Sequence, residues 1–309
     1  MATVRQLLEP GVIALRDAGV ASPRLDAELL LAAATGTDRT GLLAHPEAAV
    51  GAGPESAFTA FLARRRAGEP VAYIRGFKEF HGLLLGADPR ALVPRPETEL
   101  LVELVLARIT GRLSSAPRPA GSPPLRVWDV GTGSGAIAVA LAVALRRRRY
   151  EGAVAFVASD VSSAALGLAL ENAVAHGVAD RIELVAADLL APPEAGGAID
   201  IVAANLPYLT TAELAAGPPE LAFEPRQALD GGRDGLDVIR RLLVGLPARL
   251  ASRGTAFLEI GASQGGAVRQ AMADLPGEWR LTLHRDLADR DRVAEVERGA
   301  LTAGGERVP

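Results

Sequence analysis

The sequence contains no cysteine and only four histidines in 309 residues. Without a thiol the chain cannot form a disulfide framework, a thiolate zinc site or a cysteine nucleophile. The histidines are scattered along the chain, and a protein zinc site needs several such ligands close together, so no metal site is expected. These absences leave chemistry that requires neither a thiol nor a metal.

An excess of positive charge and long apolar runs are also missing. The chain has 33 basic and 37 acidic residues, a formal net charge of −4, which is unlike a polycationic nucleic-acid coat. Its mean hydropathy of +0.20 comes from alanine and aliphatic residues, and no apolar run approaches the ~20 residues of a membrane helix. The first residues, MATVRQLLEPG, do not resemble a secretory signal. We therefore expect a cytoplasmic protein without membrane association or stable nucleic-acid binding.

Three zones of different pattern follow one another along the chain. Residues 1–70 place apolar side chains at helical spacing and predict a small helical N-terminal domain. Residues 71–96 carry short apolar stretches split by glycines and predict a hairpin or connector. Residues 97–309 form the third zone, and a helix is expected at its start, from about Glu97 to Ile109. A proline- and serine-rich linker is expected over Leu113–Leu125.

Most of the third zone alternates short apolar runs with helical segments. This alternation is typical of an α/β fold in which helices cover both faces of a parallel sheet. The last two runs are too close for a helical crossover, so an antiparallel edge is expected there. The predicted strands are Val127–Val130, Val154–Ala158, Ile182–Ala186, Ile199–Ala203, Ala256–Ile260, Trp279–His284 and Val293–Val296.

A glycine-rich turn separates the first of these strands from a helix. It consists of Gly131, Thr132, Gly133, Ser134 and Gly135. Glycine lets the backbone turn sharply there and approach a ligand at contact distance, which a Cβ atom would prevent. The spacing also satisfies a relaxed dinucleotide fingerprint, so both a nicotinamide cofactor and S-adenosyl-L-methionine are compatible with this loop.

Two aspartates end the next two strands. Asp160 lies where a doubly wound sheet presents a carboxylate to ribose hydroxyls. Asp188 lies at the end of the third strand, where a carboxylate can accept a hydrogen bond from an adenine amino group while Leu189 covers the ring. Together with the glycine turn and with Asn205, which follows the fourth strand, these residues predict a site for an adenosine-bearing ligand.

The segment Asn205-Leu206-Pro207-Tyr208 follows the fourth strand and suits methylation of a planar nitrogen, whose lone pair is delocalised. The Asn205 side-chain oxygen and the Leu206 backbone carbonyl can each accept one hydrogen of an NH₂ group and favour the charge that develops there. Pro207 restricts Leu206 to an extended backbone, and Tyr208 offers a flat wall. A general base is not required, because the product can lose its proton afterwards.

Seven segments spread in order over nearly the whole chain carry a family resemblance. They are Glu69–Ile74, Glu79–Leu83, Val93–Glu99, the glycine turn, Asn205–Tyr208, Phe223–Arg226 and Arg285–Arg292. Together they resemble the HemK/PrmC family of protein-glutamine methyltransferases. The resemblance implies a Rossmann-like class I methyltransferase core, with a seven-stranded, mostly parallel sheet whose last strand is antiparallel. It also implies a helical N-terminal domain that helps dock the substrate, S-adenosyl-L-methionine as donor, and as acceptor the glutamine amide in the Gly-Gly-Gln motif of a peptide chain release factor.

One departure from the family pattern keeps other functions open. The family usually has Asn-Pro-Pro-Tyr, whereas this chain has Leu206 at the second position, as in rRNA adenine dimethyltransferases. An adenine-N6 methyltransferase of RNA or DNA and a non-catalytic donor-binding paralogue are therefore the alternatives. A nicotinamide dehydrogenase would leave Asn205–Tyr208 unexplained.

A motif typical of another enzyme class lies further along the chain. Residues Gly261–Gly265 match the nucleophile elbow of hydrolases. Only 44 residues follow Gly265, and they contain a single histidine, His284, which lies within a predicted strand. A hydrolase needs its acid and histidine on later loops, so we favour the methyltransferase.

Overall fold

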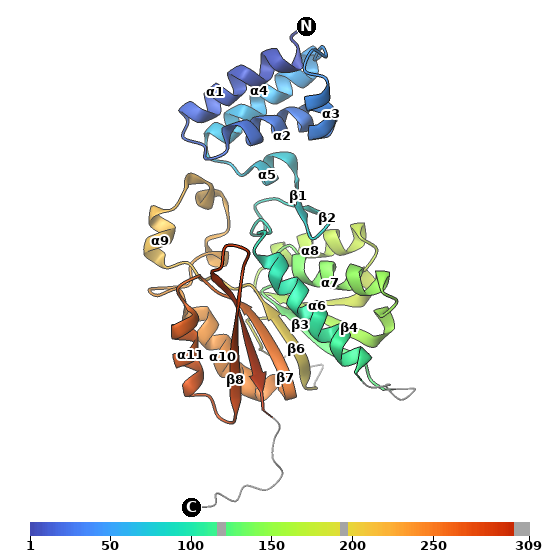
Figure 1. Cartoon of the computed structure of the whole chain (residues 1–309), viewed down its shortest axis with the longest axis vertical. Coiled ribbons are helices and arrows are strands. Elements are labelled where there is room, and N and C mark those ends of the chain that lie inside the picture. Colours follow the sequence, from blue (N-terminus) through green and yellow to red (C-terminus); the bar gives the residue numbers. More distant parts are fainter. Residues whose placement is uncertain (116–121, 192–196, 300–309) are drawn as a thin grey trace, which may run out of the picture.

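The computed structural model describes residues 1–115, 122–191 and 197–299. Short helices form one end of the molecule, and a twisted sheet flanked by helices forms the rest (Figure 1). The first part comprises α1 (Val4–Asp17), α2 (Pro23–Thr35), α3 (Arg39–Ala44), α4 (Ala52–Arg66), α5 (Val71–Arg75), β1 (Phe77–Phe80) and β2 (Leu83–Gly86). The remainder comprises α6 (Thr98–Ser114), β3 (Leu125–Val130), α7 (Ala136–Arg147), η1 (Glu151–Ala153), β4 (Val154–Asp160), α8 (Ser163–Ala175), η2 (Ala179–Arg181), β5 (Ile182–Ala186), β6 (Ile199–Ala204), α9 (Thr211–Ala216), η3 (Pro219–Phe223), η4 (Arg226–Ala228), α10 (Asp237–Arg249), β7 (Leu250–Glu259), α11 (Gly265–Ala273), β8 (Trp279–Arg285) and β9 (Asp291–Arg298).

The helices α1 to α4 pack around a small core of their own. Leu15, Leu30 and Leu31 are completely buried in it, and Phe58 of α4 is nearly so. The start of α1 is fixed by a capping box between Thr3 and Gln6, which satisfies two backbone N–H groups that the helix itself cannot bond. The helices expected over residues 1–70 are thus present.

The hairpin expected over residues 71–96 occupies only part of that range. The strands β1 and β2 pair antiparallel, and His81 and Gly82 form their tight turn with positive φ angles of 49° and 70°. The prediction was wrong for Val71–Arg75, which is the helix α5. One helical turn is too short to show a 3.6-residue period, and Gly76, in a left-handed conformation, ends it.

Seven strands form the main sheet in the order β5-β4-β3-β6-β7-β9-β8. The five strands from β5 to β7 pair parallel, and β9 pairs antiparallel to both β7 and β8. The mostly parallel sheet with an antiparallel last strand is confirmed. The antiparallel strand is not the edge, however, because the short turn after β8 folds β9 back between β7 and β8.

Helices cover both faces of this sheet (Figure 1). The helices α6 and α7 bury their apolar side chains against one face, and α10 and α11 do so against the other. The helix α6 continues to Ser114, beyond the predicted end at Ile109 and into the predicted linker over Leu113–Leu125. Part of that linker, residues 116–121, lies outside the described residues. None of the helices in the described part of the chain combines the length and apolar character that spanning a bilayer requires.

Strand register places the predicted functional segments side by side. Val130 at the end of β3 pairs with Ser159 of β4 on one side and with Ala204 of β6 on the other. The chain thus leaves β3 in one direction and later returns on its other side. In doubly wound sheets a ligand crevice forms at such a switch point, outside the carboxyl ends of the strands.

Candidate active site

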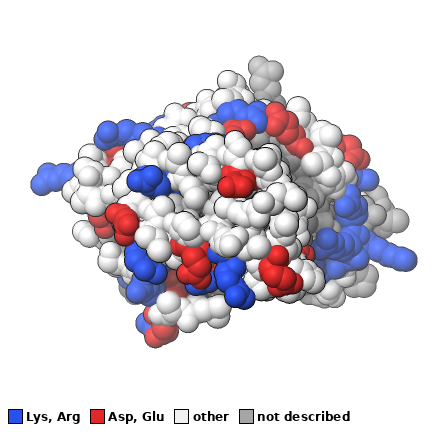
Figure 2. Space-filling model, turned by 90° about the horizontal axis from the view of Figure 1, so that it is seen from above, with Lys and Arg blue, Asp and Glu red and all other residues white. Residues whose placement is uncertain are grey.

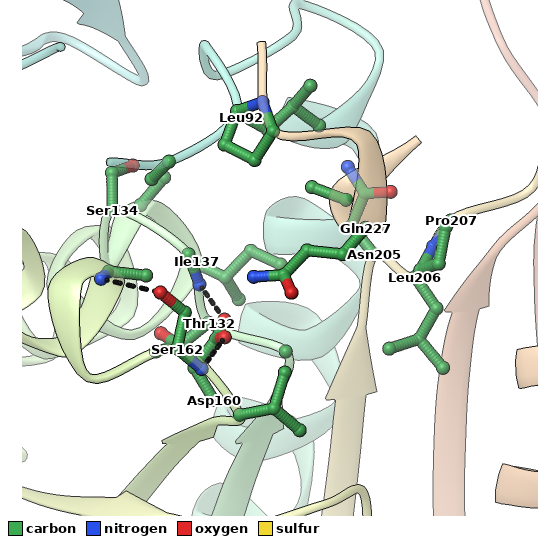
Figure 3. Close-up of a pocket in the computed structure, with 18 of the residues that line it drawn as sticks. Leu92, Thr132, Ser134, Ile137, Asp160, Ser162, Asn205, Leu206, Pro207 and Gln227 are labelled. Atoms are coloured by element: carbon green, nitrogen blue, oxygen red, sulfur yellow. Dashed lines mark hydrogen bonds between the residues drawn. The ribbon is translucent and has the colours of Figure 1, made fainter. Parts of the chain in front are cut away.

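A cavity of about 350 Å³ lies at this switch point (Figure 3). Its volume falls within the range of small-molecule sites. The predicted site residues that line it are Gly131, Thr132, Gly133, Ser134, Asp160, Asp188, Leu189, Asn205, Leu206 and Pro207. Two others, Gly135 and Tyr208, are absent from the lining. The structure therefore brings most of the predicted residues together, although they come from four different loops.

A buried aspartate, which was not predicted from the sequence, hydrogen-bonds to the glycine turn and to the helix that follows it. Asp129, the fifth residue of β3, accepts hydrogen bonds from the Thr132 hydroxyl at 2.6 Å and the Ala138 backbone N–H at 3.1 Å. Complete burial raises the pKa of the Asp129 carboxyl to about 7, although these two donors oppose the shift. An aspartate among the apolar residues of Val127–Val130 was the available signal.

The glycines of the turn face different surroundings. A Cβ atom on Gly133 would have only Ala91 within 4 Å, at 3.9 Å, so the backbone there borders open space. A Cβ atom on Gly131 would lie 2.9 Å from Cδ2 of Leu206. Both residues have positive φ angles, 55° and 71°, which side chains rarely adopt. Gly133 thus leaves room for a ligand, whereas Gly131 leaves room for the Leu206 side chain.

Asp160 supports the turn and reaches the cavity at the same time. One carboxylate oxygen accepts from the Gly133 backbone N–H at 2.9 Å, and the other accepts from the Ser162 N–H at 2.9 Å. Figure 3 shows this carboxylate between the glycine turn and the start of α8. Each oxygen retains a lone pair for a further donor.

Asp188 has a partner that no sequence pattern indicates. Its carboxylate pairs with the Arg241 guanidinium of α10 at 2.6 Å, and both side chains are about half exposed, at 54% and 57%. Such an exposed pair contributes little to stability and can be exchanged for a ligand contact. Leu189 beside it has a positive φ of 52°, an uncommon conformation for leucine.

Asn205 projects into the cavity from the end of β6, while the Leu206 side chain points away from it (Figure 3). The Asn205 side-chain N–H donates to the Thr98 hydroxyl oxygen at 2.9 Å, and the Thr98 hydroxyl donates to Glu259 at 2.7 Å. Leu206 is buried, with 5% exposure, in the apolar layer beneath β3 and β6. Sequence reasoning missed Thr98 and Glu259, although Thr98 lies in one of the seven segments.

Tyr208 lies beside the cavity and is turned toward the same carboxylate. Its hydroxyl donates to Glu259 at 3.1 Å, and its backbone carbonyl accepts from the Gln264 side-chain amide at 2.9 Å. Burial, and then the neighbouring Glu259 charge, raise the pKa of the Tyr208 phenol. Gln264 belongs to the segment that resembles a hydrolase elbow, whereas His284 contacts Glu295 on the adjacent strand. That segment therefore fastens Tyr208 in place.

A stretch of chain between β2 and α6 closes one side of the cavity, with Arg90, Ala91, Leu92, Val93, Pro94 and Arg95 in its lining. We call residues 90–95 the cover segment. The Ala91 carbonyl accepts from the Tyr73 hydroxyl at 2.7 Å. Glu224, whose side chain is fully buried, accepts from the Val93 N–H at 2.9 Å and pairs with Arg95. These bonds attach the cover segment to α5 and to the loop after β6.

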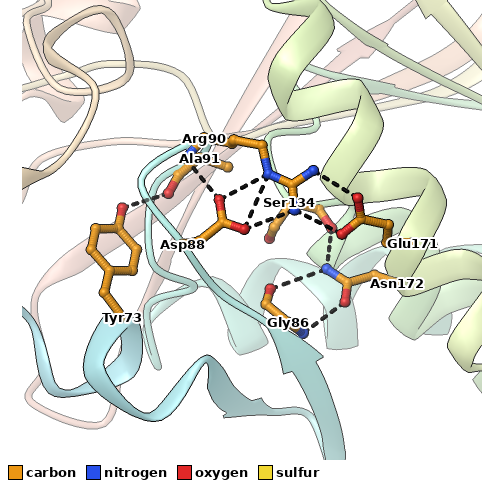
Figure 4. Close-up of polar contacts among 8 residues, drawn as sticks. All are labelled: Tyr73, Gly86, Asp88, Arg90, Ala91, Ser134, Glu171 and Asn172. Carbon is orange, nitrogen blue, oxygen red and sulfur yellow. Dashed lines mark hydrogen bonds and ion pairs between the residues drawn. The ribbon is translucent and has the colours of Figure 1, made fainter.

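Polar contacts also attach the start of this stretch to α8 and the glycine turn (Figure 4). The Asn172 amide donates to the Ser134 carbonyl at 2.8 Å and accepts from the Gly86 N–H at 2.7 Å. Arg90 donates hydrogen bonds to both Asp88 and Glu171. These bonds raise the pKa of the Arg90 guanidinium, and the bond to Glu171 has the larger effect. Nothing in the spacing of these residues along the chain indicates such long-range pairs.

Comparison with known proteins identifies two matching family models. Residues 6–76 match the PrmC N-terminal domain, and residues 127–222 match a methyltransferase domain. A release factor glutamine methyltransferase of Moorella thermoacetica is 42% identical over 94% of this chain and 96% of its own length. Another, of Rhodopirellula baltica, is 37% identical over 96% of each chain.

Among solved structures, the hMettl16 catalytic domain in complex with MAT2A 3'UTR hairpin 1 is similar in fold. It aligns with a TM-score of 0.53 over 82% of each chain, at 16% sequence identity. This likeness bears on the fold alone.

Proposed function

The chain belongs to the family of release factor glutamine methyltransferases. We propose that it transfers a methyl group from S-adenosyl-L-methionine to a glutamine of a release factor, and that Asn205 of this chain binds the amide of that glutamine. The observation that carries this assignment is Asn205, directly after β6. Its side chain hydrogen-bonds to Thr98 and lines the same cavity as the glycine turn. An amide at that position can receive an NH₂ group beside a bound adenosine ligand.

The cavity lining fits such a donor. The open space at Gly133 admits a ligand against the backbone, and Asp160 retains acceptor capacity for ribose hydroxyls. Asp188 and the Leu189 side chain would bind the adenine, and Arg241 would then exchange its partner. When bound, S-adenosyl-L-methionine supplies a methyl group attached to a positively charged sulfur. We propose these roles together with those of Thr132 and Ser134, which complete the turn.

At the acceptor side, Asn205 Oδ1 and the Leu206 carbonyl would each accept one N–H of the glutamine amide. This pairing holds the NH₂ group in place and favours the positive charge that develops on nitrogen. Leu206 contributes its backbone only, since its side chain lies in the core. Pro207 lines the cavity, and the role of Tyr208 as a flat wall stays a prediction.

We further propose that residues 1–70 dock the protein substrate, residues 71–96 connect the two parts and residues 97–309 form the catalytic domain. The helical part is joined to the loop after β6 by Arg65. Its buried guanidinium pairs with Asp26 of α2 at 2.7 Å and with Glu220 of η3. The docking surface would thus be tied to the loop that carries the contacts of the cover segment.

The face of the molecule drawn in Figure 2 gives no support to a nucleic-acid substrate. Figure 2 shows basic and acidic side chains scattered over a largely uncharged face, with a basic group at the right-hand edge and no continuous basic stripe. A nucleic-acid enzyme would present a clustered positive surface to the phosphate backbone.

The decisive experiment is transfer of a labelled methyl group by the purified chain. The acceptors are a release factor, the same factor with its Gly-Gly-Gln glutamine changed to alanine, and rRNA. We expect label on the first protein alone, and Asn205→Ala should abolish it even at a donor concentration that saturates the variant. Label on rRNA alone would contradict the proposed acceptor.

A further inference from the structure

Behind Asn205 a short series of hydrogen bonds ends on a buried carboxylate. Thr98 is 3% exposed and the Glu259 side chain lies entirely inside the protein. Both Glu259 oxygens are engaged, one by the Thr98 hydroxyl and one by the Tyr208 hydroxyl. We propose that Thr98 and Glu259 are positioning residues that set which end of the Asn205 amide faces the acceptor; this inference rests on the proposed function.

The fold places these residues together by register. Ala204, the last residue of β6, pairs with Leu258 of β7, so Asn205 directly after β6 lies near Glu259, the last residue of β7. Thr98 is the first residue of α6, and its hydroxyl lies between the two. Three elements that are far apart in sequence thus meet at one point, although Glu259 itself does not line the cavity.

The direction of the hydrogen bonds decides the orientation of Asn205. An ionised carboxylate only accepts, so the Thr98 proton must point to Glu259. The Thr98 oxygen is then left as an acceptor, and only the NH₂ end of the Asn205 amide can satisfy it. Oδ1 of Asn205 is consequently the end available to a substrate N–H.

A neutral Glu259 would remove this constraint. The protonated carboxyl can donate to Thr98, whose own proton is then free to point to Asn205. The amide can turn over to accept it, and its NH₂ end would face the acceptor NH₂. Two donors would meet there, and the acceptor would lose one of its two partners.

Several charged groups bear on the state of Glu259. Burial raises the pKa of the Glu259 carboxyl above its usual value, and hydrogen bonds from Thr98 and Tyr208 and the charge of Arg292 on β9 offset this only in part. Glu97 before α6 raises the pKa further. The N-terminal end of α6 also favours a negative charge near Thr98. Protonation of Glu259 at acidic pH therefore gives the orientation a pH dependence.

The first test compares Thr98→Val with Thr98→Ser, in the full chain with release factor and S-adenosyl-L-methionine. Valine keeps the shape and removes the hydroxyl, and serine keeps the hydroxyl. We expect kcat to fall about 10- to 100-fold in Thr98→Val, by analogy with the loss of a hydrogen-bond partner that orients a metal ligand. Thr98→Ser should recover most of it, and the donor Kd should change less than about twofold in both variants.

The second test is the pH profile of kcat. In the wild type, kcat should fall as the pH drops through the pKa of Glu259. Tyr208→Phe removes a hydrogen bond that stabilises the carboxylate, so the fall should move to higher pH. Glu259→Gln should show a low kcat without that acid limb, at an unchanged donor Kd.

The outcomes separate this proposal from the proposed function. If Asn205→Ala is inactive on release factor but Thr98→Val matches the wild type, the positioning role is refuted and the methyltransferase assignment stands. The positioning role is likewise refuted if Glu259→Gln keeps the wild-type acid limb. If the wild type itself does not methylate the release factor, the proposed function fails first.

Discussion

Replacement of Gly131 by alanine tests whether the glycine turn and the Leu206 side chain fit each other as the structure shows. The new Cβ would lie 2.9 Å from Cδ2 of Leu206, closer than such atoms approach. Alanine would also adopt a φ of 71°, which costs about 1–2 kcal/mol. Overpacking in a filled core adds about 1–3 kcal/mol. The free energy of unfolding should therefore decrease by about 2–5 kcal/mol.

The clash can be separated from the backbone strain by a double-mutant cycle. Leu206→Ala alone should cost about 2–5 kcal/mol, because it leaves a cavity in the core. In the double variant the clash disappears and only the strain remains, so the total should be about 1–3 kcal/mol smaller than the sum. Gly133→Ala is the matched control, because it imposes positive φ without a close contact, and it should add to Leu206→Ala.

The measurement is urea unfolding without donor, followed by the fluorescence of the two tryptophans, of which Trp128 is 1% exposed in β3 next to the turn. The reasoning fails if the Gly131 and Leu206 substitutions add to within about 0.5 kcal/mol, as independent sites do. It also fails if Gly133→Ala shows the larger coupling.

Three further predictions concern the described charges. Arg65→Ala should lower the free energy of unfolding by about 3–5 kcal/mol in urea titrations, because it leaves the buried Asp26 carboxylate without its cation. The control Arg66→Ala replaces an exposed side chain and should change the free energy of unfolding by less than about 0.5 kcal/mol. Asp160→Ala should weaken donor binding at least about tenfold by calorimetry, because the ribose contacts and the bond to the glycine turn are lost. The exposed control Asp180→Ala should leave the donor affinity unchanged. Equal affinities in the two variants would show that Asp160 does not belong to the donor site. Asp129 has a pKa of about 7 in the fold against 3.8 as its ordinary value, so the folded state holds the extra proton and stability should decline as pH rises from about 4 to 7. Asp129→Asn should flatten that decline in urea titrations repeated across this pH range, and an unchanged slope would contradict the assignment.

The strands could be predicted closely from sequence because buried parallel strands are continuous apolar runs. Ile182–Ala186 has the same bounds as β5, and Ile199–Ala203 falls one residue short of the end of β6. The start of β7 was placed six residues late, at Ala256 rather than Leu250, because polar Ser252 and Arg253 interrupt the run at its solvent-exposed end. Polar residues at the exposed end of a strand therefore make its boundary difficult to predict from the sequence.

The part of the site that depends on local sequence could be predicted, and the part that depends on contacts between distant segments could not. Residues within two positions of the ends of predicted strands, such as Asp160 and Asn205, were proposed for the site because parallel strands share one carboxyl edge. Thr98 and Glu259 were missed because each lies far from Asn205 in sequence, 107 and 54 positions away, and meets it only through strand order and the packing of α6. A hydrogen-bond partner across the fold leaves no spacing pattern to read.

The presence of leucine where the family usually has proline is explained by a division of roles within Asn205–Tyr208. The side chains of Asn205 and Tyr208 hydrogen-bond to Thr98 and Glu259, whereas Leu206 has its side chain in the core. A backbone carbonyl is the same acceptor in either residue, so the substitution alters packing and leaves the proposed chemistry intact. The packing consequence falls on Gly131, whose missing Cβ provides the space for Cδ2. The residue that departs from the family pattern is thus coupled to stability through Gly131, whereas the proposed contact with the acceptor NH₂ group depends on Asn205.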